Sequence, residues 1–558
     1  MAELVLGPVL RWVDPTRATI WVQTSAPGTV EVTAGSATGS APTFSAFGHH
    51  YGLVVLDGLT PGTRTRYRVT LDGESVWPLS DSPFPDSEIR TPAPGQPVRL
   101  AFGSCREATP SATQYAYPPD ALDCYARHLA RDELAWPDYL MLLGDQVYAD
   151  KISPRTRRLL RRWRRHRAGP EHHVVDFTEY THLYEESWSD PELRWLLSTV
   201  PSMMIFDDHE VIDDWNTSKA WRRDMARHSW WRDRIVGALA SYWVYQHLGN
   251  LSPEELATDP VAADVRTGGD VTELLTEFAI AADAEADGEP GPRWSYRIDV
   301  GRTRIVILDT RCSRVLEESS RDMLPESEWS WFADQLFGDY DHLVVGASLP
   351  WLLPPAIHHV EAWNERLCSS RLPVVARASE WLRRGVDLEH WAAFGTSFRR
   401  LGELLIDAAR GAFTPQPPTT VTVVSGDVHH SYLARLVGRE VDAGAAPIYQ
   451  AVCSPTHNQA PHALKLGFVI GWSRPAARLG ASLARLAGVP RPPYRWEKLA
   501  GPYFQNALAT VRLDPAAAEF TLYGTRRAGD GSGRLEALES RTLGDAEPTA
   551  VPPTASRR

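Results

Sequence analysis

The stretch from Tyr139 to Tyr148 (Tyr-Leu-Met-Leu-Leu-Gly-Asp-Gln-Val-Tyr) limits the possible folds of this chain more than any other part of the sequence. Its apolar run ends abruptly at Gly144 and Asp145. An uninterrupted apolar run is typical of a strand that is buried on both faces. In open α/β sheets, ligands bind at the edge where such strands end. We therefore predict an α/β fold in which the carboxylate of Asp145 lies at a functional edge.

Three more apolar strands end in side chains that can bind a metal or carry a proton: Val98–Gly103 before Cys105 and Arg106, Val200–Phe206 before Asp207, Asp208, His209 and Glu210, and Thr419–Ser425 before Asp427 and His429. Adjacent carboxylates repel each other unless a positive charge neutralises them, so the acidic group predicts a bound cation. A single Cys is more often an inert buried thiol, but the position of Cys105 after a strand favours a ligand role. Asp427 and His429 stand on alternate positions, so both reach one metal only if the chain turns tightly after Gly426.

Residues 1 to 95 form short alternating strands separated by Gly and Pro turns, a pattern typical of a β-sandwich. Leu59-Thr-Pro-Gly followed by Tyr67 resembles a corner of fibronectin type III domains in which a Tyr ring closes the turn. The segment has no clustered acid, His or Cys, so we expect a structural or docking module.

Composition excludes several classes of protein. A chain of 558 residues with 21 Trp is long enough for two or more folded domains. Its net charge of −12 argues against wholesale binding of nucleic acid. The five scattered Cys, with no CxxC pair, argue against a disulfide framework and the usual structural zinc site. No export signal or membrane span is recognisable, so we expect a cytoplasmic location.

Four other features of the sequence carry predictions. Asp309 ends a further strand, where a structural role is favoured over a place in the site. His390, before a Leu-rich helix, is a candidate for lining the pocket. Leu251–Pro292 is expected to be a surface excursion. Leu464–Val489 has a helical, amphipathic pattern that fits packing on the core, with contact to a lipid surface as the alternative.

The four strand-end motifs, in this order, resemble those of the PhoD-type alkaline phosphatases in the calcineurin-like metallophosphoesterase superfamily, over about residues 98 to 530. The resemblance implies a four-layer αββα core behind an N-terminal fibronectin III- or Ig-like β-sandwich. We divide the chain into that sandwich (1–95), a catalytic domain (96–535) and a C-terminal tail expected to be disordered (536–558).

The resemblance also implies the metals and their ligands. Ferric iron would be held by Cys105, Asp145, Tyr148 and His429. Calcium would be held by Asp145, Asp427 and the acidic group, with Asp208 as a ligand. Two Asn that often follow this group in the family correspond to Asp213 and Asp214, so Asp214 is a further candidate and other divalent metals stay open.

The implied reaction is hydrolysis of a phosphomonoester or phosphodiester by water activated between two cations. His209 would protonate the leaving group, Arg106 would stabilise the phosphoryl charge, and His209, Arg106 and His390 would contact the substrate. Two alternatives remain: a phospholipase D-like phosphodiesterase that acts on lipid headgroups, with peripheral membrane contact through Leu464–Val489, and a non-enzymatic docking scaffold. The sequence does not determine the oligomeric state.

Overall fold

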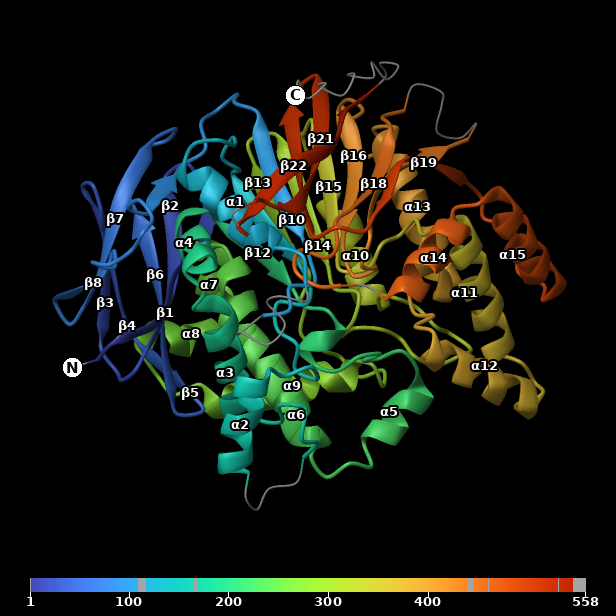
Figure 1. Cartoon of the computed structure of the whole chain (residues 1–558), viewed down its shortest axis with the longest axis horizontal. Helices are drawn as coiled ribbons and strands as arrows, with labels where there is room; N and C mark the ends of the chain where they lie inside the picture. The colour runs from blue at the N-terminus through green and yellow to red at the C-terminus, as the bar shows by residue number, and fades with distance from the viewer. Residues whose placement is uncertain are drawn as a thin grey trace.

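Two mixed β-sheets lie face to face at the centre of the molecule, as the computed structural model shows (Figure 1). The structure describes residues 2–108, 117–164, 169–438, 445–459, 461–529 and 531–544. The sheets meet through apolar side chains, and one hydrophobic cluster takes residues from both. They approach so closely that a Cβ added to Gly346 in one sheet would lie 3.3 Å from Met141 in the other.

The first sheet holds three of the four predicted strands with functional ends. Its order is β12 (Ser202–Ile205), β11 (Tyr139–Leu143), β10 (Val98–Gly103), β20 (Ala507–Asp514), β21 (Ala517–Arg527) and β22 (Gly533–Leu543). β10, β11 and β12 are parallel, so their carboxyl ends lie at one edge. β20, β21 and β22 continue the sheet in antiparallel pairs.

The second sheet carries the strand that ends at Asp427. Its order is β13 (Tyr296–Val300), β14 (Thr303–Leu308), β15 (His342–Ala347), β16 (Thr420–Ser425), β18 (Ile448–Val452), β17 (Ser431–Val437) and β19 (Arg495–Tyr503). β14, β15, β16 and β18 are parallel. Every residue of β11, β14, β15 and β16 is buried, which explains why β11 is apolar throughout and why the other three strands are rich in Val, Ile and Leu.

Helices cover the outer face of each sheet and complete the four layers. α1 (Ala121–Ala130) packs on β20 and β22, and α13 (Gly395–Ala409) packs on β16 and β18. Other helices beside the core are α3 (Phe177–Trp188), α4 (Pro191–Thr199), α6 (Trp231–Tyr242), α10 (Glu326–Gln335) and α11 (Pro355–Cys368). The predicted αββα core is therefore confirmed.

The N-terminal domain is the predicted β-sandwich, at the left of Figure 1. One sheet has the order β1 (Leu4–Val13), β2 (Arg17–Thr24), β6 (His49–Asp57), β5 (Phe44–Ala46); the other contains β4 (Ala37–Pro42), β3 (Thr29–Ala34), β7 (Arg64–Leu71), β8 (Glu74–Trp77) and, beside β7, β9 (Glu88–Arg90). β9, the last strand of the sandwich, ends at Arg90, and β10 begins at Val98.

Polar contacts fix the sandwich to the catalytic domain. The buried Arg11 guanidinium donates to the carbonyl oxygen of Gln246 at 2.5 Å and to Oδ1 of Asn250 at 2.9 Å. The prediction that Tyr67 closes a turn within the sandwich is wrong: its hydroxyl donates to the carbonyl oxygen of Ser198 in α4, at 2.6 Å. The domain is therefore docked within its own chain.

Two features of the fold differ from the prediction: the packing of one segment and the end of the catalytic domain. Leu251–Pro292 is not a surface excursion, because α7 (Pro253–Thr258), α8 (Pro260–Thr267) and α9 (Thr272–Glu285) bury Leu256, Leu275 and Ala279. The domain boundary at 535 is also wrong, because β22 pairs with β21 as far as Leu543 and extends the first sheet. The expected disorder of 545–558 lies outside the described residues.

The amphipathic segment forms two helices, α14 (His462–Gly471) and α15 (Arg474–Leu486), which pack on α11 at the right of Figure 1 beside α12 (Pro373–Gly385). The predicted helical pattern is thus confirmed. Among the helices that the structure describes, none is long and apolar enough to cross a membrane.

Candidate metal centre

The backbone turns sharply at the ends of β10, β11 and β16, three of the four functional strands. Cys105, Asp145, Asp427 and His429 all have left-handed φ angles, of 58°, 54°, 64° and 48°. Such conformations are unusual for residues with a Cβ and cost on the order of 1 kcal/mol each. The amide of His429 donates to the carbonyl oxygen of Asp427 at 2.7 Å, which confirms the predicted tight turn after Gly426.

Two glycines allow the strand ends to approach one another. A Cβ at Gly144, whose φ is +102°, would lie 2.6 Å from the Cβ of Asp207. A Cβ at Gly426 would lie 1.9 Å from the hydroxyl of Ser104, which accepts a hydrogen bond from the amide of Asp427 at 3.0 Å. Glycine is thus required at both positions because a side chain would separate the strand ends.

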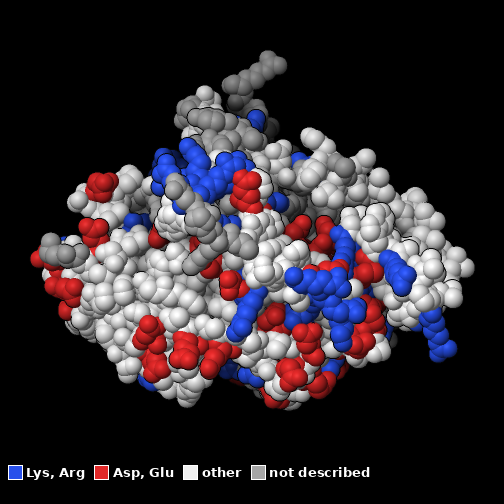
Figure 2. Space-filling view, turned by 90° about the horizontal axis from the view of Figure 1, so that it is seen from below, with Lys and Arg blue, Asp and Glu red and all other residues white. Residues whose placement is uncertain are grey.

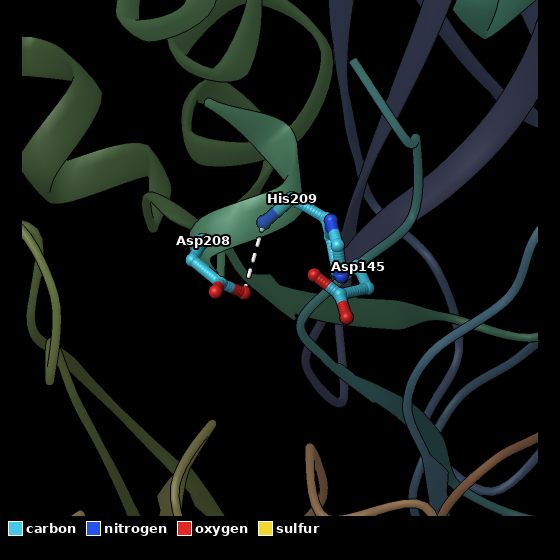
Figure 3. A group of neighbouring side chains, drawn as sticks. All are labelled: Asp145, Asp208 and His209. Atoms are coloured by element: carbon cyan, nitrogen blue, oxygen red, sulfur yellow. Dashed lines mark hydrogen bonds between the residues drawn. The ribbon is translucent and has the colours of Figure 1, made fainter. Parts of the chain in front are cut away.

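Four carboxylates gather where the two sheets meet. Asp145, Asp207, Asp208 and Asp427 each offer an oxygen within 4.8 Å of the others, and Asp145, Asp208 and His209 form an overlapping group. Figure 3 shows the side chains of Asp145 and Asp208 facing the same space, with the Asp208 carboxylate accepting from the amide of His209 at 3.0 Å. The structure therefore brings together the predicted Asp145, Asp208 and Asp427, and it adds Asp207.

This cluster suits a cation. Burial raises the pKa of Asp145 well above its usual range, and the Asp208 and Glu210 carboxylates raise it further against the opposing effect of His209. Oδ1 of Asp145 and Oδ2 of Asp207 are buried without a hydrogen-bond partner. Buried carboxylates without partners are costly, and a metal ion would satisfy them. The donor set therefore fits a metal site built from Asp and His.

Cys105 and Tyr148 lie next to this cluster. The Tyr148 hydroxyl is 3.3 Å from Oδ2 of Asp145 and accepts from Nδ2 of Asn458 at 2.9 Å. Burial and the charge of Asp145 raise the pKa of both the Cys105 thiol and the Tyr148 phenol well above their usual values, so a strong cation would be needed to ionise them. Cys105 does not belong to the two compact groups of His, Cys, Asp and Glu donors described above.

His429 is partly buried, and its ring is neutral. Burial lowers its pKa to about 4, because it outweighs the opposing charge of Asp427. A neutral imidazole is the form that binds metals. His429 also lies outside the two compact donor groups, so its role as a ligand stays a prediction.

His209 is held in place by a residue that the sequence did not single out. Its Nδ1 lies 2.9 Å from Oδ1 of Asp150, and its ring lies 4.5 Å from the Tyr148 ring, between centroids. Burial lowers the pKa of His209, but the charges of Asp150, Asp145 and Asp208 outweigh burial and hold the pKa well above its usual value. These charges favour the protonated ring, whose Nε2 lies on the side away from Asp150.

Arg311 supplies a fixed positive charge that sequence reasoning missed. The fully buried guanidinium bonds to Asp207 and to Oε1 of Glu389. Its Nη2 lies 3.5 Å from Oδ1 of Asp208 and 3.6 Å from Oδ1 of Asp427. The sequence does contain a feature that indicates this residue, because Arg311 follows β14, whose carboxyl end lies at the same edge of the second sheet as the end of β16.

Asp309 has the structural role that we predicted. Its carboxylate accepts from the backbone amides of Arg311, Cys312 and Ser313 at 2.8 to 3.0 Å. These bonds shape the turn that presents Arg311 to the cluster.

The other predicted residues take different positions. His390 bridges Oε1 of Glu361 at 2.8 Å and Oδ2 of Asp427 at 3.1 Å, so it orients a carboxylate of the cluster. Asp214 has a buried, unpartnered Oδ1, and burial with Glu389 and Asp387 raises its pKa to about 9. Asp214 thus adds a donor beside the cluster.

Arg106 is engaged elsewhere. Its Nε donates to Oδ2 of Asp120 at 2.7 Å, and its Nη1 donates to the carbonyl oxygen and hydroxyl of Ser187, each at 3.1 Å. The side chain is buried, and these hydrogen bonds give Arg106 a structural role in the fold. The geometry therefore does not support the predicted contact of Arg106 with a phosphoryl group.

Comparison with known families gives two matches. The profile of the PhoD-like phosphatases matches residues 104–466, and that of a domain of unknown function (DUF7800) matches residues 1–89. No match was found among curated proteins.

Solved structures with a similar fold include one titled "Structure of PhoD". It shares 13% identity over 98% of this chain and 92% of its own, with a TM-score of 0.59. A purple acid phosphatase from yellow lupin (Lupinus luteus) seeds shares 11% identity over 96% of this chain and 74% of its own, with a TM-score of 0.48. The first of these likenesses supports the fold described above.

Proposed function

Because this chain belongs to the PhoD-like phosphatase family, we propose that it is a metal-dependent hydrolase of phosphoric esters, acting on phosphomonoesters or phosphodiesters. The observation that carries the proposal is the cluster of the buried Asp145, Asp207 and Asp208 with the partly buried Asp427, beside His209. Such a cluster is expensive to bury without a cation, and its place at the strand ends is where substrates reach an α/β fold.

The proposed metals are ferric iron and calcium, with other divalent ions as the alternative. Iron would be held by Cys105, Asp145, Tyr148 and His429, because a thiolate, a phenolate and a carboxylate together favour a trivalent ion. Calcium, which prefers oxygen ligands, would be held by Asp145, Asp208, Asp214 and Asp427. Bound cations would polarise the phosphoryl oxygens and make water more acidic.

The protein's own groups would perform the proton transfer. Nδ1 of His209 is held by Asp150 at 2.9 Å, and this carboxylate favours the protonated ring, which would donate a proton to a departing alkoxide. His390, by contrast, already uses both ring nitrogens, for Glu361 and Asp427. We therefore assign the acid role to His209 and a positioning role to His390.

The first experiment is elemental analysis of the purified protein together with its visible spectrum. Iron and calcium with a tyrosinate-to-iron absorption band, lost in Tyr148→Phe, would support the proposed ligands. Zinc or manganese without iron would keep the hydrolase and overturn the roles of Cys105 and Tyr148. A metal-free protein that no cation activates on any phosphoester would refute the function and favour the scaffold alternative.

A phosphodiesterase that acts on lipid headgroups remains a second candidate. It is favoured by the exposed aliphatic side chains of α14 and α15, the nearest of which follow Asn458 closely along the chain. Hydrolysis of a soluble ester and of a phospholipid would be compared at equal enzyme concentration, and a preference for the soluble ester would reject this candidate.

A further inference from the structure

The two helices α14 and α15 expose large aliphatic side chains to solvent. The exposed positions are Leu464, Leu466, Val469, Ile470, Leu479, Leu483 and Leu486. On α15, Leu479, Leu483 and Leu486 follow one another at the spacing of a single helix side. Leu479 is 65% exposed and Leu486 is 86% exposed. We call these seven residues the α14–α15 face.

The leucines of α15 are not needed for packing. The helix contacts α11 through small residues, since Gly480 and Ala484 are buried and a Cβ at Gly480 would lie 3.1 Å from the carbonyl oxygen of Ala356. A surface helix normally buries its large apolar side chains. The reverse arrangement here indicates that the α14–α15 face is covered by something outside the described chain.

The surroundings of this face are positively charged. Between Asp442 and Glu497 the sequence has no Asp or Glu, although the chain as a whole has a net charge of −12. The same segment carries Lys465, Arg474, Arg478, Arg485, Arg491 and Arg495. In Figure 2, the outermost right end, where α12 and α15 lie, shows mainly white and blue atoms.

A cavity beside α15 combines the two properties. It encloses about 350 Å³ between α15 and the start of α11. Its lining includes Pro355, Ala484 and Trp496 together with Arg485, Arg491 and Arg495. A lining that combines apolar side chains with three arginines suits a phosphate headgroup attached to an acyl chain.

We propose that the α14–α15 face binds the surface of an anionic phospholipid bilayer. The leucines would enter the headgroup boundary, and the arginines would attract the negative lipids. A second copy of this chain fits less well, because a symmetric interface would place the same arginines against one another. Burial of the leucines and attraction of the arginines therefore both favour an anionic bilayer as the partner of this face.

The face lies close along the chain to the candidate metal centre. Asn458, which donates to the Tyr148 hydroxyl, precedes α14 by four positions. On α14, the Phe468 ring stacks on His430 at 4.0 Å between centroids, next to His429. Membrane docking would therefore hold the centre near lipid phosphoesters, a consequence that rests on the proposed function, whereas vesicle binding does not.

The test is co-sedimentation of the full chain with vesicles of phosphatidylcholine, with or without about one third phosphatidylglycerol. We expect binding to the anionic vesicles that weakens as salt increases. The double variant Leu479→Gln/Leu486→Gln should bind at least on the order of tenfold more weakly, because it loses buried apolar area. Arg478→Gln/Arg485→Gln should also weaken binding, by about fivefold for each arginine.

The matched control is Arg155→Gln/Arg158→Gln/Arg162→Gln on α2 (Pro154–Trp163), which removes exposed arginines far along the chain from this face. It should leave vesicle binding unchanged. No binding to anionic vesicles, or equal loss in the α2 control, would overturn the proposal. A concentration-dependent dimer that the leucine variant abolishes, without vesicle binding, would instead assign the face to a second copy. Turnover of a soluble phosphoester, measured in parallel, reports separately on the proposed function.

Discussion

Replacing Arg311 by Met should destabilise the protein strongly when no metal is present. The guanidinium is fully buried and bonds to Asp207 and Glu389. Glu389 keeps a second partner, because Arg314 lies 3.2 Å from its Oε2, but Asp207 has no other ion pair among the described residues. Removing one member of a buried ion pair typically costs about 3–5 kcal/mol, since the other charge stays buried and unpaired.

Guanidinium unfolding in the presence of a chelator would measure this loss. The matched control is Arg302→Met, because Arg302 also bonds to two carboxylates, Asp339 and Asp341, but is half exposed. An exposed pair contributes less than about 1 kcal/mol. Titration with calcium should then restore more stability to the Arg311 variant than to the parent, since the cation supplies the missing charge. If both variants lost the same small amount, the buried charge of Arg311 would not be what holds the carboxylates together.

Three further predictions test other parts of the molecule. Asp145→Asn should abolish hydrolysis yet leave the metal-free fold at least as stable, because burial already raises the pKa of Asp145; wild-type turnover would contradict the site. Burial, with Asp309 and Glu328, raises the pKa of Glu285 from 4.5 to about 8. The folded state therefore binds the proton of the Glu285 carboxyl more tightly than the unfolded state does. This difference stabilises the fold fully below pH 4.5, and the stabilisation is lost as the pH rises through about 8. Glu285→Gln should remove that loss and stabilise the protein by roughly 1–3 kcal/mol at pH 9, as thermal unfolding at pH 5 and pH 9 would show; an unchanged pH dependence would refute it. Tyr67→Phe should cost about 1 kcal/mol, the value of its bond to Ser198, in the same unfolding assay, and no change would show that this contact does not hold the domains together.

The strand ends could be predicted because they depend on local sequence. An apolar run that stops at Gly-Asp determines both the burial of the strand and the position of Asp145. The same reasoning located Cys105, Asp208 and Asp427. The parallel pairing of β10, β11 and β12 then brings the ends together without further information.

The partners across the site could not be predicted, because they come from distant parts of the chain. Asp150 meets His209 across 59 positions, and Arg311 meets Asp207 across 104. The hydroxyl of Tyr67 was assigned to its own domain because its acceptor, Ser198, lies 131 positions away. Each pairing is decided by the packing of sheets and domains, which no local pattern encodes.

β22 was missed for a different reason. It is an edge strand with a largely polar sequence and mostly exposed or half-buried side chains. Such a strand has little hydrophobic signal, and its backbone hydrogen bonds to β21 decide its conformation. Because β22 has so little hydrophobic pattern, the predicted end of the catalytic domain at residue 535 is also wrong.

The position of β10 has a consequence for synthesis on the ribosome. This strand pairs on one side with β11, which follows soon after, and on the other with β20, about 400 residues later. At 5–20 residues per second, the free edge of β10 would wait roughly 20–80 s for its partner. An unpaired edge strand is prone to aggregate. The nascent chain therefore depends on protection of that edge, and any truncation before Ala507 would leave the strand beside Cys105 permanently open.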